Sequence, residues 1–103
     1  MSEILGKWEQ PVGQPYPGLW FEFRADGTFR AELPSMGISS GGTYRAANGE
    51  IDLEQTEHTL GLTGTFYGRY QVEGDTLIMT LGDPGAPRPD LEHKNKRLYR
   101  KIG

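Results

Sequence analysis

Residues 37–41, Gly-Ile-Ser-Ser-Gly, form a G-x-S-x-G pattern with Ser39 at its centre. In serine hydrolases this pattern is the nucleophile elbow, a sharp turn that exposes the serine hydroxyl for attack on a carbonyl carbon. Such a serine also needs a histidine as general base and an acid that orients the histidine. His58 and His93 are the only histidines of the chain, while acidic residues are common. Whether Ser39 is a nucleophile therefore depends on the scaffold around it.

The residues that follow Ser39 do not fit an elbow. An elbow places the serine between a strand of a parallel sheet and a helix. Here the chain continues as Ser-Gly-Gly-Thr-Tyr-Arg-Ala, a glycine pair followed by a strand pattern. The chain has 103 residues, too few for the α/β-hydrolase fold with its sheet, helices and triad. We therefore expect Ser39 to lie in a loop between two strands, at residues 34–41, and not to act as a nucleophile.

The composition is that of one small domain covering residues 1–103. The net charge of −3 argues against a nucleic-acid binder, because contacts with phosphates require a surplus of basic residues. Cysteine is absent, which excludes disulfides, thiolate nucleophiles and sulfur-ligated metals. The first residues show no signal peptide, and no apolar stretch is long enough to span a membrane. We expect a cytoplasmic protein without membrane contact.

Alternation of apolar and polar residues predicts short strands along almost the whole chain. Three hairpins are expected, with strands at 19–24 and 28–33, at 41–46 and 51–56, and at 65–72 and 76–81. Turns with glycine join the strands of each pair, at 25–27, 47–50 and 73–75. Strands at 4–9 and 96–102 complete a set of eight, and no window of twelve residues has a convincing helical period.

Eight consecutive strands with mostly short connections predict an all-β fold with little or no helix. A sheet of this size avoids open edges by closing on itself. The predicted fold class is therefore an eight-stranded antiparallel up-and-down β-barrel. Such a barrel is filled by its own side chains or is just wide enough to hold one small ligand.

The inward phase of these strands defines a set of candidate ligand-lining residues. They would form a small apolar pocket in which phenol hydroxyls orient a ligand, or they would simply fill the barrel. The set comprises Phe21, Phe23, Phe29, Tyr44, Phe66, Tyr70 and Met79. Both alternatives stay open from the sequence.

Trp20 alternates out of phase with Phe21 and Phe23, so it belongs to the outer wall of the barrel. The loop before it, PVGQPYPG at residues 11–18, is expected to cover the barrel mouth or to pack on the outer wall, with Tyr16 over Trp20. If the indole is exposed instead, it marks a contact surface, for example that of a homodimer.

The remaining charged residues give no clear metal or cofactor site. Glu50, Asp52 and Glu54 form an acidic row on one strand, where a facing arginine can pair with them, and calcium prefers oxygens that converge from a loop. Both histidines are expected to face solvent. We therefore predict no metal and no cofactor. Six of the eleven basic residues lie in 88–103, where they would steer an anionic ligand or, as we favour, form the charged outer face of the last strand.

Seven short motifs follow one another along nearly the whole chain. They are Gly6-Lys7-Trp8, FRADGTF (23–29), GTY (42–44), IDL (51–53), GRYQVEGDTL (68–77), PGAPRP (84–89) and LYRK (98–101). Each is loose, but their order resembles that of small bacterial lipocalin-like domains of the calycin superfamily, including those of planctomycetes. The resemblance implies a calycin-like barrel, although the chain is far shorter than large lipocalins and shows no C-terminal helix.

The same resemblance implies a structural role for Trp8. In calycins the tryptophan of the G-x-W signature closes one end of the barrel, and a basic residue from the last strand packs across its ring. Arg100 or Lys101 offers that base, and we assign Arg100. A cation over an indole face contributes about 0.5–2 kcal/mol.

Three functions are compatible with this sequence. We favour binding of a small hydrophobic or amphipathic molecule at one end of the barrel, between the 34–41 loop and neighbouring turns. The first alternative is an enzyme similar to calycin-like natural-product cyclases, which shape a flexible substrate, with Tyr44 and Tyr70 as hydrogen-bond donors. The second is a structural or protein-interaction domain with a filled barrel. No conventional catalytic group is expected.

Overall fold

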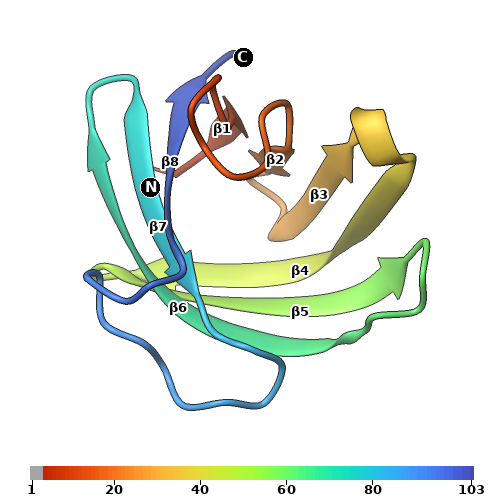
Figure 1. Ribbon diagram of the computed structural model, residues 1–103. Helices are drawn as coiled ribbons and strands as arrows, with labels where there is room; N and C mark the ends of the chain where they lie inside the picture. Colours follow the sequence, from red (N-terminus) through yellow and green to blue (C-terminus); the bar gives the residue numbers. More distant parts are fainter. Residues whose placement is uncertain (1–3) are drawn as a thin grey trace.

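The computed structural model, which describes residues 4–103, is a closed antiparallel barrel of eight strands, and the predicted fold class is confirmed (Figure 1). The strands are β1 (Gly6–Glu9), β2 (Trp20–Phe23), β3 (Thr28–Leu33), β4 (Ile38–Ala47), β5 (Glu50–His58), β6 (Gly64–Glu73), β7 (Thr76–Leu81) and β8 (Lys96–Lys101). Each strand pairs with its neighbours in the sequence, and β1 closes the barrel against β8. The single helical turn in the described residues is η1, a 3-10 turn at Pro34–Met36.

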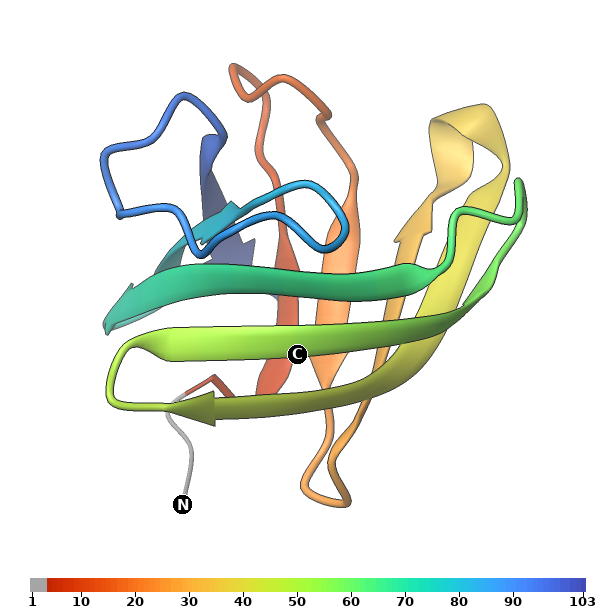
Figure 2. The same ribbon diagram turned by 90° about the horizontal axis from the view of Figure 1, so that it is seen from below.

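Up-and-down topology sends alternate connections to the same end of the barrel. Tight turns at 24–27, 48–49 and 74–75 lie at one end, which we call the base. The turn at 48–49 has Asn48 at φ 53° and Gly49 at φ 80°, the positive values that a two-residue hairpin loop of this type requires. Figure 2 shows the turn at 24–27 on one side of β2 and β3, and the loop of residues 10–19 on the other.

The opposite end, which we call the mouth, carries the long connections. These are residues 10–19, 34–37, 59–63 and 82–95. Loops at one end of a rigid barrel are the usual place for binding groups, because they vary without disturbing the scaffold. The mouth is therefore the first place to search for a site.

β4 begins earlier than the sequence predicts, and Ser39 is a strand residue rather than a loop residue. Ser39 lies opposite Glu32 of β3, and its backbone N–H donates to Thr59 Oγ1 over 2.8 Å. β5 likewise extends to His58, two residues beyond the strand predicted at 51–56. Serine and glycine give weak strand signals, so cross-strand pairing rather than the local sequence determines where β4 starts.

The middle of the barrel is filled by aromatic rings. Phe21 stacks on Phe23 with ring centroids 5.7 Å apart, and Phe23 meets Tyr44 edge to face at 5.0 Å. Phe29 lies 6.5 Å from Phe23, and Tyr99 meets Phe21 edge to face at 5.8 Å. Offset and edge-to-face pairs of this kind stabilise a core beyond the area they bury. The structure thus contains a buried aromatic cluster where a deep ligand cavity would have to be.

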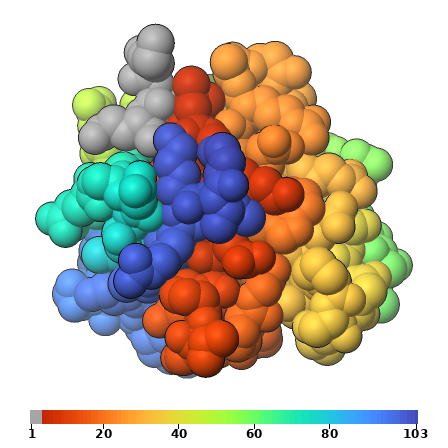
Figure 3. Space-filling model, turned by 90° about the horizontal axis from the view of Figure 1, so that it is seen from above, coloured from red at the N-terminus to blue at the C-terminus, as the bar shows by residue number. Residues whose placement is uncertain are grey.

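Trp8 closes the base. Its side chain is 1% exposed, and Nε1 donates to the carbonyl oxygen of Ile4 over 2.8 Å. The cation nearest its ring is Lys101, with Nζ 5.5 Å from the ring centroid. β1 and β8, which carry these two residues, form the closing pair of the barrel, and Figure 3 shows the C-terminal residues (blue) beside red residues of the β1 region.

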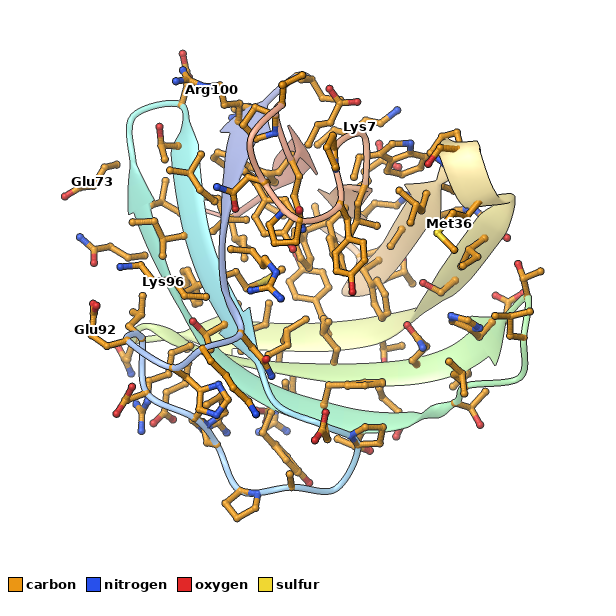
Figure 4. All side chains as sticks on the ribbon, viewed as in Figure 1. Lys7, Met36, Glu73, Glu92, Lys96 and Arg100 are labelled. Carbon is orange, nitrogen blue, oxygen red and sulfur yellow. The ribbon has the colours of Figure 1, made fainter. Side chains whose placement is uncertain are left out.

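The basic side chain over the Trp8 ring is therefore that of Lys101. The assignment of this role to Arg100 is wrong. Side chains alternate along β8, and Tyr99 is buried inside the barrel. Lys101 shares the face of Tyr99 and lies opposite Trp8, whereas Arg100 lies opposite Glu9 and points outward (Figure 4).

The 82–95 loop is fastened to the outer wall by Arg88, which is only 22% exposed at its side chain. Its guanidinium donates to the carbonyl oxygens of Ile51 (3.0 Å) and Gly68 (2.7 Å) and to Asp52 Oδ1 (2.7 Å). Glu50 pairs with Arg69 at 3.1 Å. The two acidic residues that begin the predicted row are thus neutralised by arginines.

Candidate ligand site at the barrel mouth

Two pockets open at the mouth on either side of Tyr16. Their volumes are about 190 and 200 Å³, and both are lined by Tyr16, Leu19 and Phe21. An apolar cavity of roughly 150 Å³ holds a benzene molecule, so each pocket has room for one ring or a short aliphatic chain. Both pockets reach Phe21, a buried ring of the aromatic cluster.

The loop at 10–19 crosses the mouth because a buried amide holds it there. Gln10 is 1% exposed, and its Oε1 accepts from the backbone N–H of Tyr16 at 3.0 Å. Its Nε2 donates to the hydroxyl oxygen of Tyr99 at 3.2 Å. Gln14 Oε1 accepts from the backbone N–H of Leu98 at 2.8 Å. Leu98 lies in the part of β8 that has no paired residue on β1. The loop thus covers the mouth, one of the two positions the sequence allowed, and Tyr16 contributes to its pockets.

We call the first pocket the β8 pocket because Arg97 and Tyr99 of β8 line it. Met79 and Leu81 of β7 form its apolar wall, and Gln10 and Asn95 add amide groups; the lining contains no acidic residue. Burial raises the pKa of the Tyr99 phenol to about 12, so this group stays protonated at neutral pH.

We call the second pocket the β4 pocket because Ile38 and Ser40 of β4 line it. Ala31 and Leu33 of β3 add apolar surface, and His58 and Gln55 of β5 supply polar groups. This pocket lies next to the 34–37 turn, where the sequence placed the ligand end of the barrel.

The β4 pocket is not a hydrolase site. His58 Nδ1 accepts from the backbone N–H of Leu60 at 3.0 Å, so a neutral imidazole carries its proton on Nε2 and acts as a donor, not a base. The Ser39 hydroxyl oxygen lies 3.3 Å from Thr59 Oγ1, and no hydrogen bond joins Ser39 to His58 or His93 in residues 4–103. The pocket therefore contains neither a histidine placed as a general base nor a serine hydrogen-bonded to one.

The seven candidate lining residues separate into two groups. Phe21 and Met79 line the mouth pockets. Phe23, Phe29 and Tyr70 are buried below them, and the other two, Tyr44 and Phe66, are partly buried against the same core. Most of the set therefore packs the barrel.

The mouth also uses residues that sequence reasoning did not single out. They are Gln10, Leu19, Ser40, Arg97 and Tyr99. The alternation of β8 was the available signal for Arg97 and Tyr99, since both share the inward phase of that strand. Nothing in the sequence marks Gln10 as a residue of the mouth, because an amide side chain just after a strand is ordinarily exposed.

Trp20 lies on the outer wall, as its phase predicts, with Lys7 Nζ 4.0 Å from its ring centroid. The ring is half-buried, and Tyr16 points to the mouth pockets rather than to it. The larger hollows, about 410 Å³ over β4–β6 and about 490 Å³ along the 82–95 loop, are lined mainly by polar side chains or by loop residues. They resemble ligand sites less than the mouth pockets do.

Both histidines are half-buried rather than solvent-facing, and Nδ1 of His93 accepts from Asn95 N at 3.1 Å. Within residues 4–103 no three His, Asp or Glu side chains come together as metal ligands would. In the same part of the chain no helix has the length and apolar character needed to cross a bilayer.

Comparison with known proteins gives no relative: the chain matches no family model, and no curated protein or solved structure is significantly similar to it. What is established is the architecture, an all-β closed barrel of eight antiparallel strands around a buried aromatic cluster.

Proposed function

We propose that this protein is a small lipocalin-like barrel that binds a small amphipathic molecule at its mouth. One observation carries the proposal: two apolar-walled pockets share Tyr16, Leu19 and Phe21 in their linings, at the end of the barrel that bears the long loops. Each pocket combines core side chains with a few polar groups at its rim. That combination, an apolar wall with a small number of orienting polar groups, is typical of small-molecule sites.

The filled interior limits the size of the ligand. The rings of Phe21, Phe23 and Phe29 occupy the middle of the barrel, so a long lipid chain has no room along the axis. The two pockets lie on either side of Tyr16, which is 48% exposed. Displacement of Tyr16 would join them into one site of about twice the volume. The expected ligand has roughly the size of one or two rings.

Two structural features support the lipocalin-like assignment. The barrel is closed and its strands run up and down in sequence order. Trp8 seals the base with a cation over its ring, the arrangement that the resemblance of the motifs implies. The cyclase alternative has less support, since the Tyr44 hydroxyl donates to the Arg24 carbonyl oxygen and neither Tyr44 nor Tyr70 lines a mouth pocket.

A protein-interaction role is the second candidate, and exposed apolar side chains on the mouth loops favour it. Val12, Met36, Leu60 and Leu62 are each more than half exposed. Such side chains often mark contact surfaces. Sedimentation velocity separates the two functions: a monomer at millimolar concentration that still binds small probes excludes self-association as the role of these loops.

The test of ligand binding is a methyl NMR titration with 2-phenylethanol, a neutral amphipathic probe. We expect chemical-shift changes at the methyl groups of Leu19, Leu33 and Met79, which lie at the mouth. Ile4 and Ile51, buried away from both pockets, serve as internal references.

A pair of variants sharpens this test. Leu19→Ala removes a wall shared by both pockets and should weaken binding, whereas Leu60→Ala removes an equally large side chain that lines neither pocket. The absence of any shift up to the solubility of the probe, or equal loss in both variants, would refute the proposed site.

A further inference from the structure

The β8 pocket contains an arginine that has no acidic partner. Arg97 lies on the inner face of β8, opposite the buried Met79. Its Nη1 donates to the carbonyl oxygens of Lys94 (3.1 Å) and Lys96 (2.9 Å). Within residues 4–103, no group accepts from its Nε or Nη2, and no carboxylate lies within ion-pair distance.

The other arginines differ from Arg97 in pairing or in position. Four of them form ion pairs with a glutamate or an aspartate: Arg24, Arg30, Arg69 and Arg88. Arg45 and Arg100 are exposed, where water solvates the charge. Arg97 alone among these arginines is half-buried, lines a mouth pocket and keeps donors without a protein acceptor. A charge in such a position is favourable only when water or an anion occupies the pocket.

The Tyr99 hydroxyl is a second unused donor in the same pocket. Because Gln10 Oε1 accepts from Tyr16 N, the Gln10 group facing Tyr99 is the amide NH₂. The phenol oxygen therefore accepts from Gln10, and the described residues supply no acceptor for its own hydrogen. Tyr99 is only 3% exposed, and the positive charge of Arg97 is close enough to oppose the burial effect on the Tyr99 pKa.

We propose that the β8 pocket binds a carboxylate head group, held by the guanidinium of Arg97 and the hydroxyl of Tyr99. The proposal rests on the proposed ligand site at the mouth and names the chemical class of its ligand, a small monocarboxylic acid. A carboxylate offers acceptors only, and it matches both the planar fork of arginine and a phenol donor. The apolar part of the acid lies against Phe21 and Leu19, which continue from this pocket toward the β4 pocket.

The volume of the pocket and the type of donors set the choice of probe. About 190 Å³ accommodates a ring with a short acidic arm. Phenylacetate and 2-phenylethanol share the ring and the arm, and they differ in the charged end. At pH 7 phenylacetate is ionised, so the difference between their dissociation constants measures what the carboxylate contributes.

We expect phenylacetate to bind roughly tenfold to a hundredfold more tightly than 2-phenylethanol, the range for hydrogen bonds to a charged group. Arg97→Gln should remove this preference, so that the dissociation constants of the two probes for this variant lie within about twofold of each other. Arg100→Gln is the matched control, because it removes the same charge from a neighbouring outward position of β8 and should leave the preference intact. Tyr99→Phe should reduce the preference several-fold.

The outcomes separate the two proposals. Equal affinity for both probes refutes the carboxylate head group and leaves the mouth site standing. Binding of neither probe refutes both. A preference that survives Arg97→Gln, or that Arg100→Gln reduces equally, shows attraction to the overall charge and refutes the assigned residues. Thermal unfolding of each variant verifies folding, and the Arg97 comparison decides the matter even if Tyr99→Phe is unstable.

Discussion

Gly68 is a position where a single added methyl group tests the packing of β6 against β7. It lies on the inward phase of β6, opposite Leu81 of β7. A Cβ atom built there would be 2.1 Å from the Thr80 carbonyl oxygen and 2.9 Å from Leu81 Cδ2. The nearer contact is backbone, which cannot rotate away. Movement of β6 is also resisted, since the Gly68 carbonyl oxygen accepts from Arg88.

Gly68→Ala should therefore destabilise the fold by about 2–3 kcal/mol, the upper part of the range for overpacking a core. The loss of backbone freedom in the unfolded chain acts in the opposite direction, by about 0.4–1 kcal/mol, and does not offset the clash. For a domain of this size the net change corresponds to a fall in the melting temperature of roughly 10–20 °C.

Urea and thermal unfolding, followed by circular dichroism, measure this difference. Gly82→Ala is the matched control, because a Cβ there has no neighbour closer than 3.4 Å and the backbone is not left-handed. We expect its free energy of unfolding to stay within about 0.5 kcal/mol of the native value. If the two alanine variants are equally stable, the close approach of β6 and β7 at Gly68 is wrong.

Three further predictions concern the two tryptophans, the buried phenol and the anchored loop. Iodide should quench Trp20 and spare Trp8, so the Trp20→Phe variant should emit at shorter wavelength and resist quenching; free quenching of that variant would contradict the sealed base. The Tyr99 pKa is raised from about 10 to about 12, so the protonated phenol stabilises the fold fully below pH 10, and this contribution disappears as pH rises toward 12. Urea unfolding at pH 9 and pH 11.5 should show that loss in the native protein but not in Tyr99→Phe. Arg88→Gln should cost about 1.5–3 kcal/mol and speed amide exchange in the 82–95 loop, whereas Arg45→Gln, in an exposed position, should change neither.

The strands of this barrel could be predicted because their own residues alternate. The hairpin of β2 and β3 has three aromatic residues on one face and charged residues on the other, and both strands appear within one residue of the prediction. The start of β4 could not be predicted in the same way. Ser39, Ser40 and Gly41 have little strand propensity, and they are extended because β3 lies alongside them.

The ends of the barrel were harder to predict than its wall. Alternation along the last strand was enough to choose Lys101 over Arg100 as the residue that covers Trp8. A tyrosine buried at position 99 places residue 101 on the same inward face of the strand. The shape of the mouth could not be predicted from the sequence, because it depends on the direction of the Gln10 amide. That orientation arises from two partners, one six residues away and one eighty-nine residues away. Local sequence patterns contain no information on contacts of the second kind.

β8 contributes one inward basic side chain to each end of the barrel. The buried ring of Tyr99 lies between these two side chains, so a change at one end should not affect the other. Arg97 lies at the mouth, Lys101 covers Trp8 at the base, and Tyr99 packs between them against Phe21. Trp8→Phe should consequently lower the free energy of unfolding by about 1–3 kcal/mol, because it loses the hydrogen bond to Ile4 and part of the buried ring. The affinity for phenylacetate should stay within about twofold, as distant sites without shared partners act additively. A large loss of affinity in this folded variant would show that the aromatic cluster transmits changes from base to mouth, and the division of the barrel into a structural end and a binding end would then fail.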